Sequence, residues 1–378
     1  MANRGFILLI NAINNDEERN RNRIMRKQLR DQSDPLDMPE IQFRSIYRLS
    51  RNMVHNLIVS LGPHIPDGQR ERIFIPKKLK LPFIFFPKEV TKKGVGQDYF
   101  ISMSQSSVSR CISTVNTAFE GLYYKIHFPS NEEERSVVKQ GFMEMQNGFP
   151  GIVGAIDGTQ IAISAPSINN ELFPPLLFYN RKGFYSLNVQ IICDSKLKIM
   201  AINARFPGSV HDAAIWTTCQ IRELLRNNYI DGDYSSWLIG DSGYPLEPWL
   251  MTPVSNNDLT LPEQNYNTSH RSTRNVVERT IGVLKARFRC LLKHRVLHYS
   301  PTVAAKIIYS CAVLHNICLE QGEHYIHIAD GTQFQKIFYK SILEKSTHKY
   351  RAAARVYAAC VHQRIFAAPC PFSKLQSG

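Results

Sequence analysis

Three consecutive apolar runs between residues 151 and 206 constrain the fold of this 378-residue chain more than any other feature. They are GIVGAIDGTQIAI, SLNVQIICD and KIMAINARF, all rich in the β-branched residues that favour strands. A short DSK turn joins the second to the third, as in a hairpin. A helical stretch, DAAIWTTCQIRELLRNN, follows, and then the strand-like runs SWLIGDSGY and LMTPV. This order predicts an α/β fold, a mixed sheet with flanking helices.

A last helix is predicted over residues 271–292, RSTRNVVERTIGVLKARFRCLL, after a polar loop that extends to about residue 270. Its apolar residues recur at helical spacing and predict a face turned to the core. Those residues are Val277, Ile281, Leu284, Phe288 and Leu291. Glu278 lies at the edge of this face among several cations. One interpretation is a surface pair between Glu278 and Arg274, four residues earlier, worth about 0.3 to 0.5 kcal/mol.

Two aspartates occupy unusual places in the predicted strands. Asp157 falls inside the first strand, where a charge is costly unless something compensates it. Asp241 ends a later strand and is followed by small residues that leave its carboxylate open. Each alone is equally consistent with an aspartate that makes turn hydrogen bonds, as Asp194 is expected to do in the hairpin.

Together with Glu278, the two aspartates suggest a different chemistry. Acids from a first strand, a later strand and a following helix can meet at one point of a mixed sheet. Clustered carboxylates repel unless divalent cations hold them ionised. Mg²⁺ takes such oxygen ligands, and a pair of ions about 3.5 to 4 Å apart supports phosphodiester cleavage. In this interpretation Glu278 holds metal, while the cations around it hold DNA; these cations are Arg271, Arg274, Lys285 and Arg289.

The charge balance favours a polyanionic partner. Forty-six Lys and Arg against thirty-two Asp and Glu leave a formal net charge of +14. Nucleic acid is the commonest partner of such a chain, although a basic protein that binds nothing anionic remains an open alternative.

The N-terminal part of the chain is predicted to be helical. Residues 1–40 form a charged segment and linker, and SMSQSSVSRCISTVNTAFEGL carries an apolar helical stripe that Ser104 can cap. Short polar residues and Arg110 line the opposite face, and the segment resembles the second half of a helix-turn-helix. DNA contact by Arg110 and plain packing of an amphipathic helix both remain open.

The cysteines and the N-terminus point to a reduced intracellular protein without a membrane span. Eight cysteines occur singly, with no CxxC and no zinc-finger spacing. Cys311, His315 and Cys318 would share one helical face, as metal ligands or as core residues. The N-terminal run FILLINAI is too short for a membrane helix and lacks a cleavage site for a signal peptide.

Four ordered motifs carry a family resemblance. They are VGAIDGTQI, FPGSVHDAAIW, LIGDSGYPLEPWLMTPV and NVVERTIGVLKARFRCL with VLHNIC downstream. The set resembles the Harbinger transposase-derived nucleases, a DDE-type transposase superfamily, over roughly residues 40 to 320. The resemblance implies an RNase H-like fold in which Asp157, Asp241 and Glu278 form a DDE triad that holds divalent metal, Mg²⁺ or Mn²⁺.

The resemblance also carries expectations about partners and location. Active transposases of the family cut DNA at element ends with a separate Myb-like DNA-binding protein, and host-adapted members are described as nuclear or nucleocytoplasmic. The expected function is a metal-dependent DNA endonuclease. The alternative is a domesticated, non-catalytic DNA-binding or scaffold protein that retains the fold. Asp212 matches a family motif as well, and is expected either to support the metal site or to begin a helix.

The predicted domains are a charged segment at 1–40, a helical region at 41–145, an RNase H-like DDE nuclease domain at 146–320 and a basic helical tail at 321–378. Two stretches depart from the family pattern. Residues 81–96 contain Pro82 and Pro87, which cannot sit inside a helix, and the tail is longer and more basic than expected. An altered reading frame or gene decay would account for either stretch.

Overall fold

The computed structural model describes residues 39–65, 105–169 and 171–322, together with short helical pieces between residues 16 and 28. The predictions for Ser104, for residues 81–96 and for the tail beyond residue 322 lie outside the described residues. The chain divides into two compact units, one of residues 1–122 with 288–290, the other of residues 123–287 with 291–378. The predicted boundary at residue 146 therefore falls inside the second unit.

The first unit is helical in its described part. Its elements are α2 (Glu40–Tyr47), α3 (Arg51–Leu61), the 3₁₀ helix η1 (Gly62–His64) and α6 (Gln105–Phe119). Ser50 caps α3 by accepting a hydrogen bond from the Met53 amide, which satisfies one of the free donors at a helix start. The apolar stripe predicted on α6 is buried, with Val108, Ile112 and Val115 all fully inaccessible. A helix-turn-helix role for α6 stays a prediction.

The second unit is built on a five-stranded mixed sheet with strand order β3-β2-β1-β4-β5. The strands are β1 (Ile152–Ala162), β2 (Ser186–Cys193), β3 (Ile199–Pro207), β4 (Trp237–Ile239) and β5 (Leu250–Met251). The first three are antiparallel neighbours, and β4 and β5 join parallel to β1. The predicted mixed α/β sheet is therefore confirmed.

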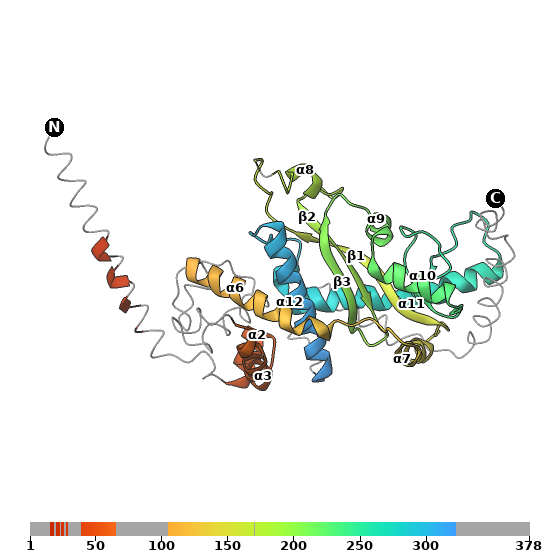
Figure 1. Ribbon diagram of the computed structural model, residues 1–378, viewed down its shortest axis with the longest axis horizontal. Helices are drawn as coiled ribbons and strands as arrows, with labels where there is room; N and C mark the ends of the chain where they lie inside the picture. Colours follow the sequence, from red (N-terminus) through yellow and green to blue (C-terminus); the bar gives the residue numbers. More distant parts are fainter. Residues whose placement is uncertain are drawn as a thin grey trace. The chain divides into compact units, whose positions relative to one another are not determined.

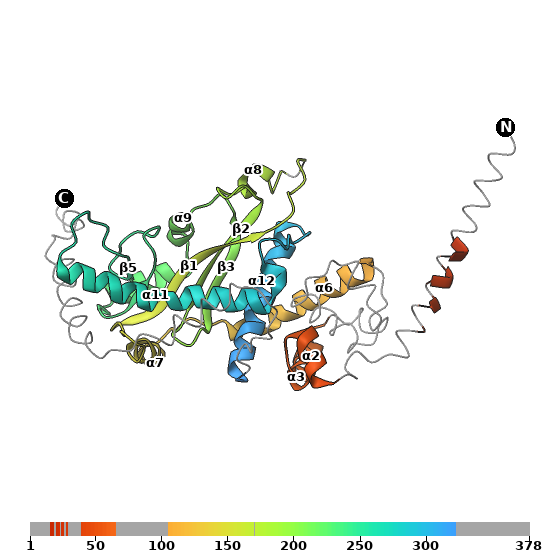
Figure 2. The same ribbon diagram turned by 180° about the vertical axis from the view of Figure 1, so that it is seen from behind.

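Helices cover both faces of this sheet. The long helix α11 (Leu261–Arg287) crosses one face against β1 and β2, while α9 (Asp212–Thr217) and α10 (Gln220–Ile230) lie on the other (Figures 1 and 2). Trp216 and Leu225 from this helix pair pack on Ile156 and Ile192 of the sheet in one hydrophobic cluster. Alternate residues of β1 point to opposite faces of the sheet. Ile156 therefore faces α9 and α10, whereas Asp157 faces α11.

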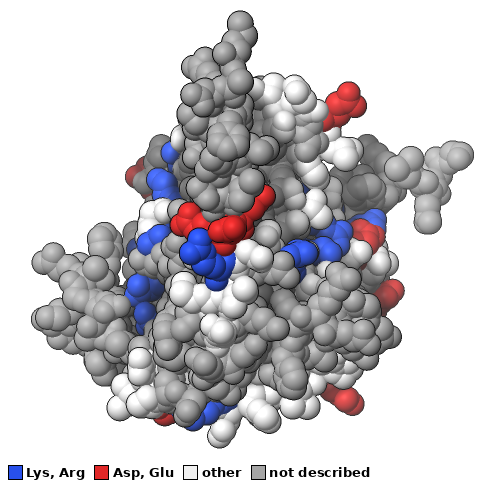
Figure 3. Space-filling model, turned by 90° about the vertical axis from the view of Figure 1, so that its left-hand side faces the viewer, with Lys and Arg blue, Asp and Glu red and all other residues white. Residues whose placement is uncertain are grey.

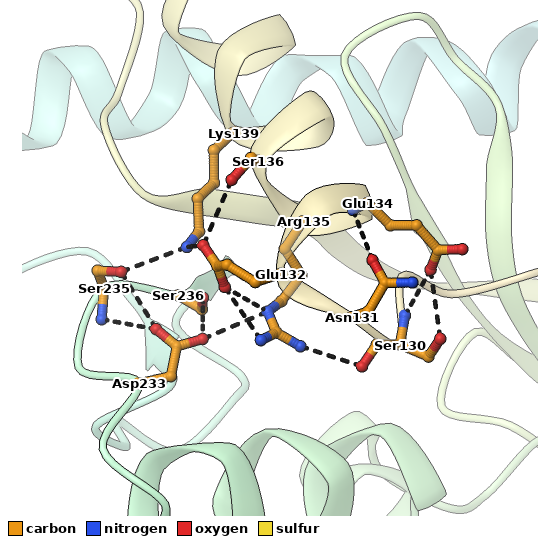
Figure 4. A network of polar contacts seen from close by, with 10 residues as sticks. All are labelled: Ser130, Asn131, Glu132, Glu134, Arg135, Ser136, Lys139, Asp233, Ser235 and Ser236. Carbon is orange, nitrogen blue, oxygen red and sulfur yellow. Dashed lines mark hydrogen bonds and ion pairs between the residues drawn. The ribbon is translucent and has the colours of Figure 1, made fainter.

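Helix α7 (Glu132–Met143) is held to the segment that leads into β4 by a polar network centred on the buried Arg135 (Figure 4). At its centre the Arg135 side chain, 9% exposed, pairs with Glu132 at 3.0 Å and with Asp233 at 3.3 Å. Lys139 adds a contact from its ammonium to Glu132 at 3.0 Å. Removing Arg135 would leave Asp233 without its cation, so the network fixes the segment that enters β4.

Helix α12 (Pro301–Glu320) closes the unit and packs against β3. It is the one helix in the described ranges long and apolar enough to cross a membrane, but 67% of its apolar window is buried in the protein, as in a core helix. Asn316 bonds both backbone groups of Ile199 and the Lys125 carbonyl, and His315 lies 2.8 Å from the Leu197 carbonyl. The VLHNIC motif thus fixes the β2–β3 hairpin, which supports the core interpretation of His315.

Two elements differ from the sequence prediction. The stretch after β3, expected as one helix, forms two, because the helix ends at Thr217 and a new one begins at Gln220. Helix α11 begins at Leu261. The prediction of a polar loop up to about residue 270 is therefore wrong from residue 261 onward. Short helices also occur: α8 (Pro175–Phe178), η3 (Glu120–Lys125) and η4 (Arg289–Leu291).

The described Lys and Arg side chains do not gather into a single patch on the face shown in Figure 3, where acidic and basic groups are interspersed.

Candidate active site

The candidate site lies where β1 runs past its short neighbour. Strand β4 pairs with β1 only from Ile152 to Ala155, whereas β1 continues to Ala162. From Asp157 onward, that side of β1 carries no strand of the described sheet. Side chains from α11 and from the loop after β4 can therefore reach the strand edge.

Asp157 is the most buried of the predicted acids, with 14% of its side chain exposed. Its Oδ1 accepts a hydrogen bond from the Gly158 amide at 2.8 Å, and its Oδ2 lies 3.0 Å from Nη2 of Arg274. Burial raises the pKa of Asp157 to about 6, against the opposing effects of Arg274 and the Gly158 amide. The negative charges of Asp241 and Asp212 raise the pKa of Asp157 further. Negative side chains therefore outnumber positive ones around Asp157.

Asp241 follows β4 in a tight turn. Gly240 permits the turn, because a Cβ there would lie only 3.0 Å from the Tyr244 ring and 3.1 Å from Ile156. The Gly243 amide donates to Asp241 Oδ1 at 2.9 Å, which leaves Oδ2 facing Nη2 of Arg274 at 3.8 Å.

Glu278 completes the cluster from α11. Its Oε1 lies 2.7 Å from Nη1 of Arg274, one helical turn earlier, and its side chain is 49% exposed. The pair suggested by the sequence is thus present, but Arg274 is only 18% exposed and shares its guanidinium with both aspartates. The three predicted acids meet on a single cation.

The distance between the two aspartate carboxylates can be compared with the spacing that a pair of metal ions requires. Because Asp157 Oδ2 and Asp241 Oδ2 both approach Nη2 of Arg274, they are at most about 7 Å apart, a span that ions about 4 Å apart could bridge. Within the described ranges, no three His, Cys, Asp or Glu side chains stand close enough to enclose one metal ion. The guanidinium occupies the space between the carboxylates.

Asp212 lies next to this cluster, as the first residue of α9. Its Oδ1 accepts a hydrogen bond from Nδ2 of Asn188 at 2.8 Å. A Cβ at residue 158 would overlap the Asp212 carboxylate, so glycine is required there for this close approach. The helix-start interpretation of Asp212 is correct, and a supporting role at a metal site stays a prediction.

The predicted DNA-binding cations take different places. Arg274 turns inward to the acids, and Lys285 donates to Thr159 Oγ1 at 2.7 Å and the Gln160 carbonyl at 3.2 Å. Burial lowers the pKa of Lys285 to about 8. Arg271 is exposed on α11. Arg110 and Arg289 belong to the first unit, where Arg110 is exposed.

Two buried groups of the site were not predicted. Tyr244, 4% exposed, accepts a hydrogen bond from Gln190 at 3.3 Å, and burial raises its pKa, with all three nearby aspartates adding to the effect. His270, 2% exposed, lies 3.4 Å from the Met251 carbonyl, and burial lowers its pKa to about 4. Tyr244 belongs to the GDSGY motif that holds Asp241, and His270 was missed because the helix was expected to begin later.

Comparison with known proteins assigns the family. A family model described as "DDE superfamily endonuclease" matches residues 156–316, a range that contains all three acids. The rat protein named "Putative nuclease HARBI1" is 34% identical over 290 residues, which cover 76% of this chain and 80% of the relative. This chain belongs to the Harbinger transposase-derived nucleases.

Other relatives place this Harbinger-derived chain in a wider group. The human protein of the same name is 34% identical over 291 residues, with 76% of this chain and 80% of the relative covered. The Arabidopsis thaliana protein named "Protein ALP1-like" is 27% identical over 232 residues, covering 58% of this chain and 55% of the relative. No solved structure matches the chain.

Proposed function

We propose that this protein is a divalent-metal-dependent DNA endonuclease that hydrolyses phosphodiester bonds through Asp157, Asp241 and Glu278. The observation that carries the proposal is the convergence of these acids, from a strand, a loop and a helix, on the guanidinium of Arg274. Residues far apart in sequence meet at the one strand edge that β4 leaves open.

The sheet supports an RNase H-like arrangement for this nuclease. Three antiparallel strands lead into two parallel ones in the order β3-β2-β1-β4-β5. Asp157 lies on the central strand, Asp241 follows the adjacent strand, and Glu278 comes from the helix that crosses the same face.

The donor set fits a hard divalent cation. Its potential ligands are carboxylate oxygens, which Mg²⁺ and Mn²⁺ prefer, and one arginine faces three acids. Burial is the main cause of the raised pKa of Asp157, with smaller contributions from Asp241 and Asp212, and a bound cation would lower that pKa. When bound, such ions activate the attacking water and stabilise the leaving oxygen.

The chain's own residues supply position and charge. Arg274 holds the three carboxylates close together, and it would have to release part of this contact for metal to take its place. His270 lies beneath the loop that carries Asp241, at the Met251 carbonyl. Arg271 lies exposed on the same helix as Glu278, where a DNA phosphate could contact it, whereas Lys285 is held by Thr159 and Gln160 of β1.

DNA is the proposed substrate, and the family resemblance supports two further proposals, a Myb-like DNA-binding partner and a nuclear or nucleocytoplasmic location. These rest on the family resemblance and not on a described contact.

A second candidate is a domesticated DNA-binding or scaffold protein without catalysis. One observation favours it: Arg274 already compensates all three acids, as an arginine would in a purely structural cluster. Its Arabidopsis relatives also carry names without a nuclease term, such as "Protein ALP1-like".

Nicking of supercoiled plasmid separates the two candidates. Purified protein is incubated with Mg²⁺ or Mn²⁺, with EDTA as the control, and open circles are counted against time. The nuclease proposal predicts metal-dependent nicking that Asp157→Asn abolishes while the protein stays folded. Wild-type protein that binds DNA but leaves the plasmid intact with either metal would establish the non-catalytic alternative.

A further inference from the structure

A polar cavity of ≈ 180 Å³ opens beside the acid cluster and has no part in the proposed chemistry. Its lining includes Gly158, the residue after Asp157, together with Gln160, Asn188 and Asp212. Gly158 and Gln160 lie on the face of β1 opposite to Asp157, because alternate residues of a strand point to opposite faces. Small-molecule pockets usually measure about 300 to 1,000 Å³, so this cavity suits a group the size of a single base or sugar.

The floor of the cavity is fixed by a chain of hydrogen bonds. Nδ2 of Asn180 donates to Ser186 Oγ, which donates to Gln160 Oε1, each at 2.6 Å. Gly208 lies against the same serine, where a Cβ would overlap Ser186. A preorganised polar floor of this kind discriminates between ligands by their donors and acceptors.

One buried atom in the cavity wall lacks a partner. Asn188 is 3% exposed, and its Nδ2 donates to the Val210 carbonyl and to Asp212 Oδ1, both at 2.8 Å. These two acceptors fix the orientation of the amide, since both need a donor. Its Oδ1 is buried with no donor among the described residues. A buried acceptor without a donor is unfavourable, and a ligand N–H would satisfy it once the cavity wall opens to this oxygen.

The rim of the cavity is cationic. Arg181 and Lys182 both line it and are exposed, and neither forms an ion pair within the described part of the chain. A ligand that fits therefore combines an anion for the rim with an N–H donor for Asn188 Oδ1.

We propose that this cavity binds one nucleotide of the DNA substrate. Its phosphate would lie on Arg181 and Lys182, and its base, extruded from the stack, would donate an exocyclic amine N–H to Asn188 Oδ1. The inference rests on the proposed nuclease function and adds a recognition subsite to it. Enzymes that extrude a base first unstack it and then identify it by its hydrogen-bonding edge. Cytosine and adenine offer an amine, and thymine does not.

Mononucleotide binding tests this directly. Titration calorimetry with dCMP, dAMP, dTMP and inorganic phosphate, without metal, measures the subsite apart from cleavage. We expect dCMP or dAMP to bind at least about fivefold more tightly than dTMP, and inorganic phosphate to bind more weakly than any nucleotide. Equal binding of the three nucleotides, or of phosphate alone, would overturn base recognition.

Two substitutions divide the subsite into its parts. Lys182→Gln should weaken all nucleotides alike and keep their order, because it removes only the phosphate contact. Asn188→Leu should erase the preference over dTMP and keep the phosphate contribution. Lys196→Gln, an exposed lysine in the β2–β3 turn, is the matched control and should change nothing.

The design remains decisive if Asn188→Leu fails to fold, which its melting curve would reveal. The wild-type order of nucleotides and the uniform loss in Lys182→Gln then carry the test. Plasmid nicking by the same preparation separates the two proposals. Nicking without nucleotide binding overturns the subsite alone, and selective nucleotide binding without nicking supports the subsite and counts against the nuclease.

Discussion

Arg274 and Asp157 lie 3.0 Å apart, nitrogen to oxygen, although 117 positions separate them in the sequence. The same guanidinium also reaches Glu278 at 2.7 Å. Arg274 therefore acts as an internal counter-ion for the acids that are proposed to hold metal, and under that proposal the guanidinium and a metal ion would compete for the same carboxylates.

Replacing this counter-ion should make the protein less stable and more responsive to metal. Arg274→Gln leaves buried Asp157 without its cation, at a cost of about 1 to 3 kcal/mol in unfolding free energy. Added Mg²⁺ or Mn²⁺ should then raise the melting temperature of the variant more than that of the wild type.

The matched control is Arg226→Gln, which removes an exposed pair with Glu223. It should leave both the stability and the metal response close to those of the wild type. An Arg274 variant that gains no extra stabilisation from metal would show that the guanidinium and the metal do not compete.

An exposed cation on α11 and a cation that is already paired with acids should contribute differently to DNA binding. Each phosphate neutralised by Lys or Arg contributes about 0.9 to the slope of log affinity against log salt. Arg271→Ala should flatten the slope by about that amount, because its exposed side chain can reach a phosphate. Arg274→Ala should not, since its charge already serves the acids.

Affinity is measured in EDTA across a salt series, so that no metal mediates the contact. Wild-type slopes in both variants would mean that this part of α11 does not contact DNA.

His315 should make the protein sensitive to acid. Burial lowers its pKa to about 4 from 6.5, so the folded protein keeps it neutral. Below pH 6.5 the unfolded chain takes up a proton that the folded chain refuses until about pH 4. The stability is therefore complete above pH 6.5 and is lost as the pH falls towards 4, by up to about 3 kcal/mol.

His315→Gln tests this, because the glutamine amide can donate to the Leu197 carbonyl without titrating. Urea unfolding at pH 7 and pH 4.5 should show a smaller loss in the variant than in the wild type. Equal losses would place the acid sensitivity elsewhere, for example at buried His270.

Asn316 should be a main contributor to the stability of the hairpin. Its amide makes hydrogen bonds of 2.7 to 2.9 Å with both backbone groups of Ile199 and with the Lys125 carbonyl. Asn316→Ala leaves these groups unsatisfied in the core and should cost about 2 to 4 kcal/mol by urea unfolding. Asn256→Ala, at an exposed position, should cost almost nothing. A small loss at Asn316 would contradict its structural role.

The sequence predicted the sheet well, because its signals are local. The first three strands begin and end within about one residue of the apolar runs, where β-branched residues determine the pattern. The early start of α11 was missed because LPEQNYNTSH has little apolar periodicity. A capping signal was present: Glu263 accepts hydrogen bonds from the Thr260 amide and hydroxyl, as in a capping box.

The candidate site was predictable in its acids and not in its cations. Asp157, Asp241 and Glu278 stand out by their motifs, and the structure brings them together. Which arginine turns inward depends on how α11 is rotated against the sheet, and the many cations of that helix look alike in sequence. The cavity beside Asn188 also escaped prediction, because Lys182 and Asp212 meet there only through the fold.

The most direct test of the central claim is the rate of plasmid nicking in Mg²⁺ by the single variants Asp157→Asn, Asp241→Asn and Glu278→Gln and by the triple variant. Carboxylates that hold metal as a unit predict that each single substitution reduces nicking to background and that the triple is no worse than the singles. Glu223→Gln, at an exposed acid outside the site, should nick at the wild-type rate. A folded triple variant that still nicks DNA at the wild-type rate would contradict the account.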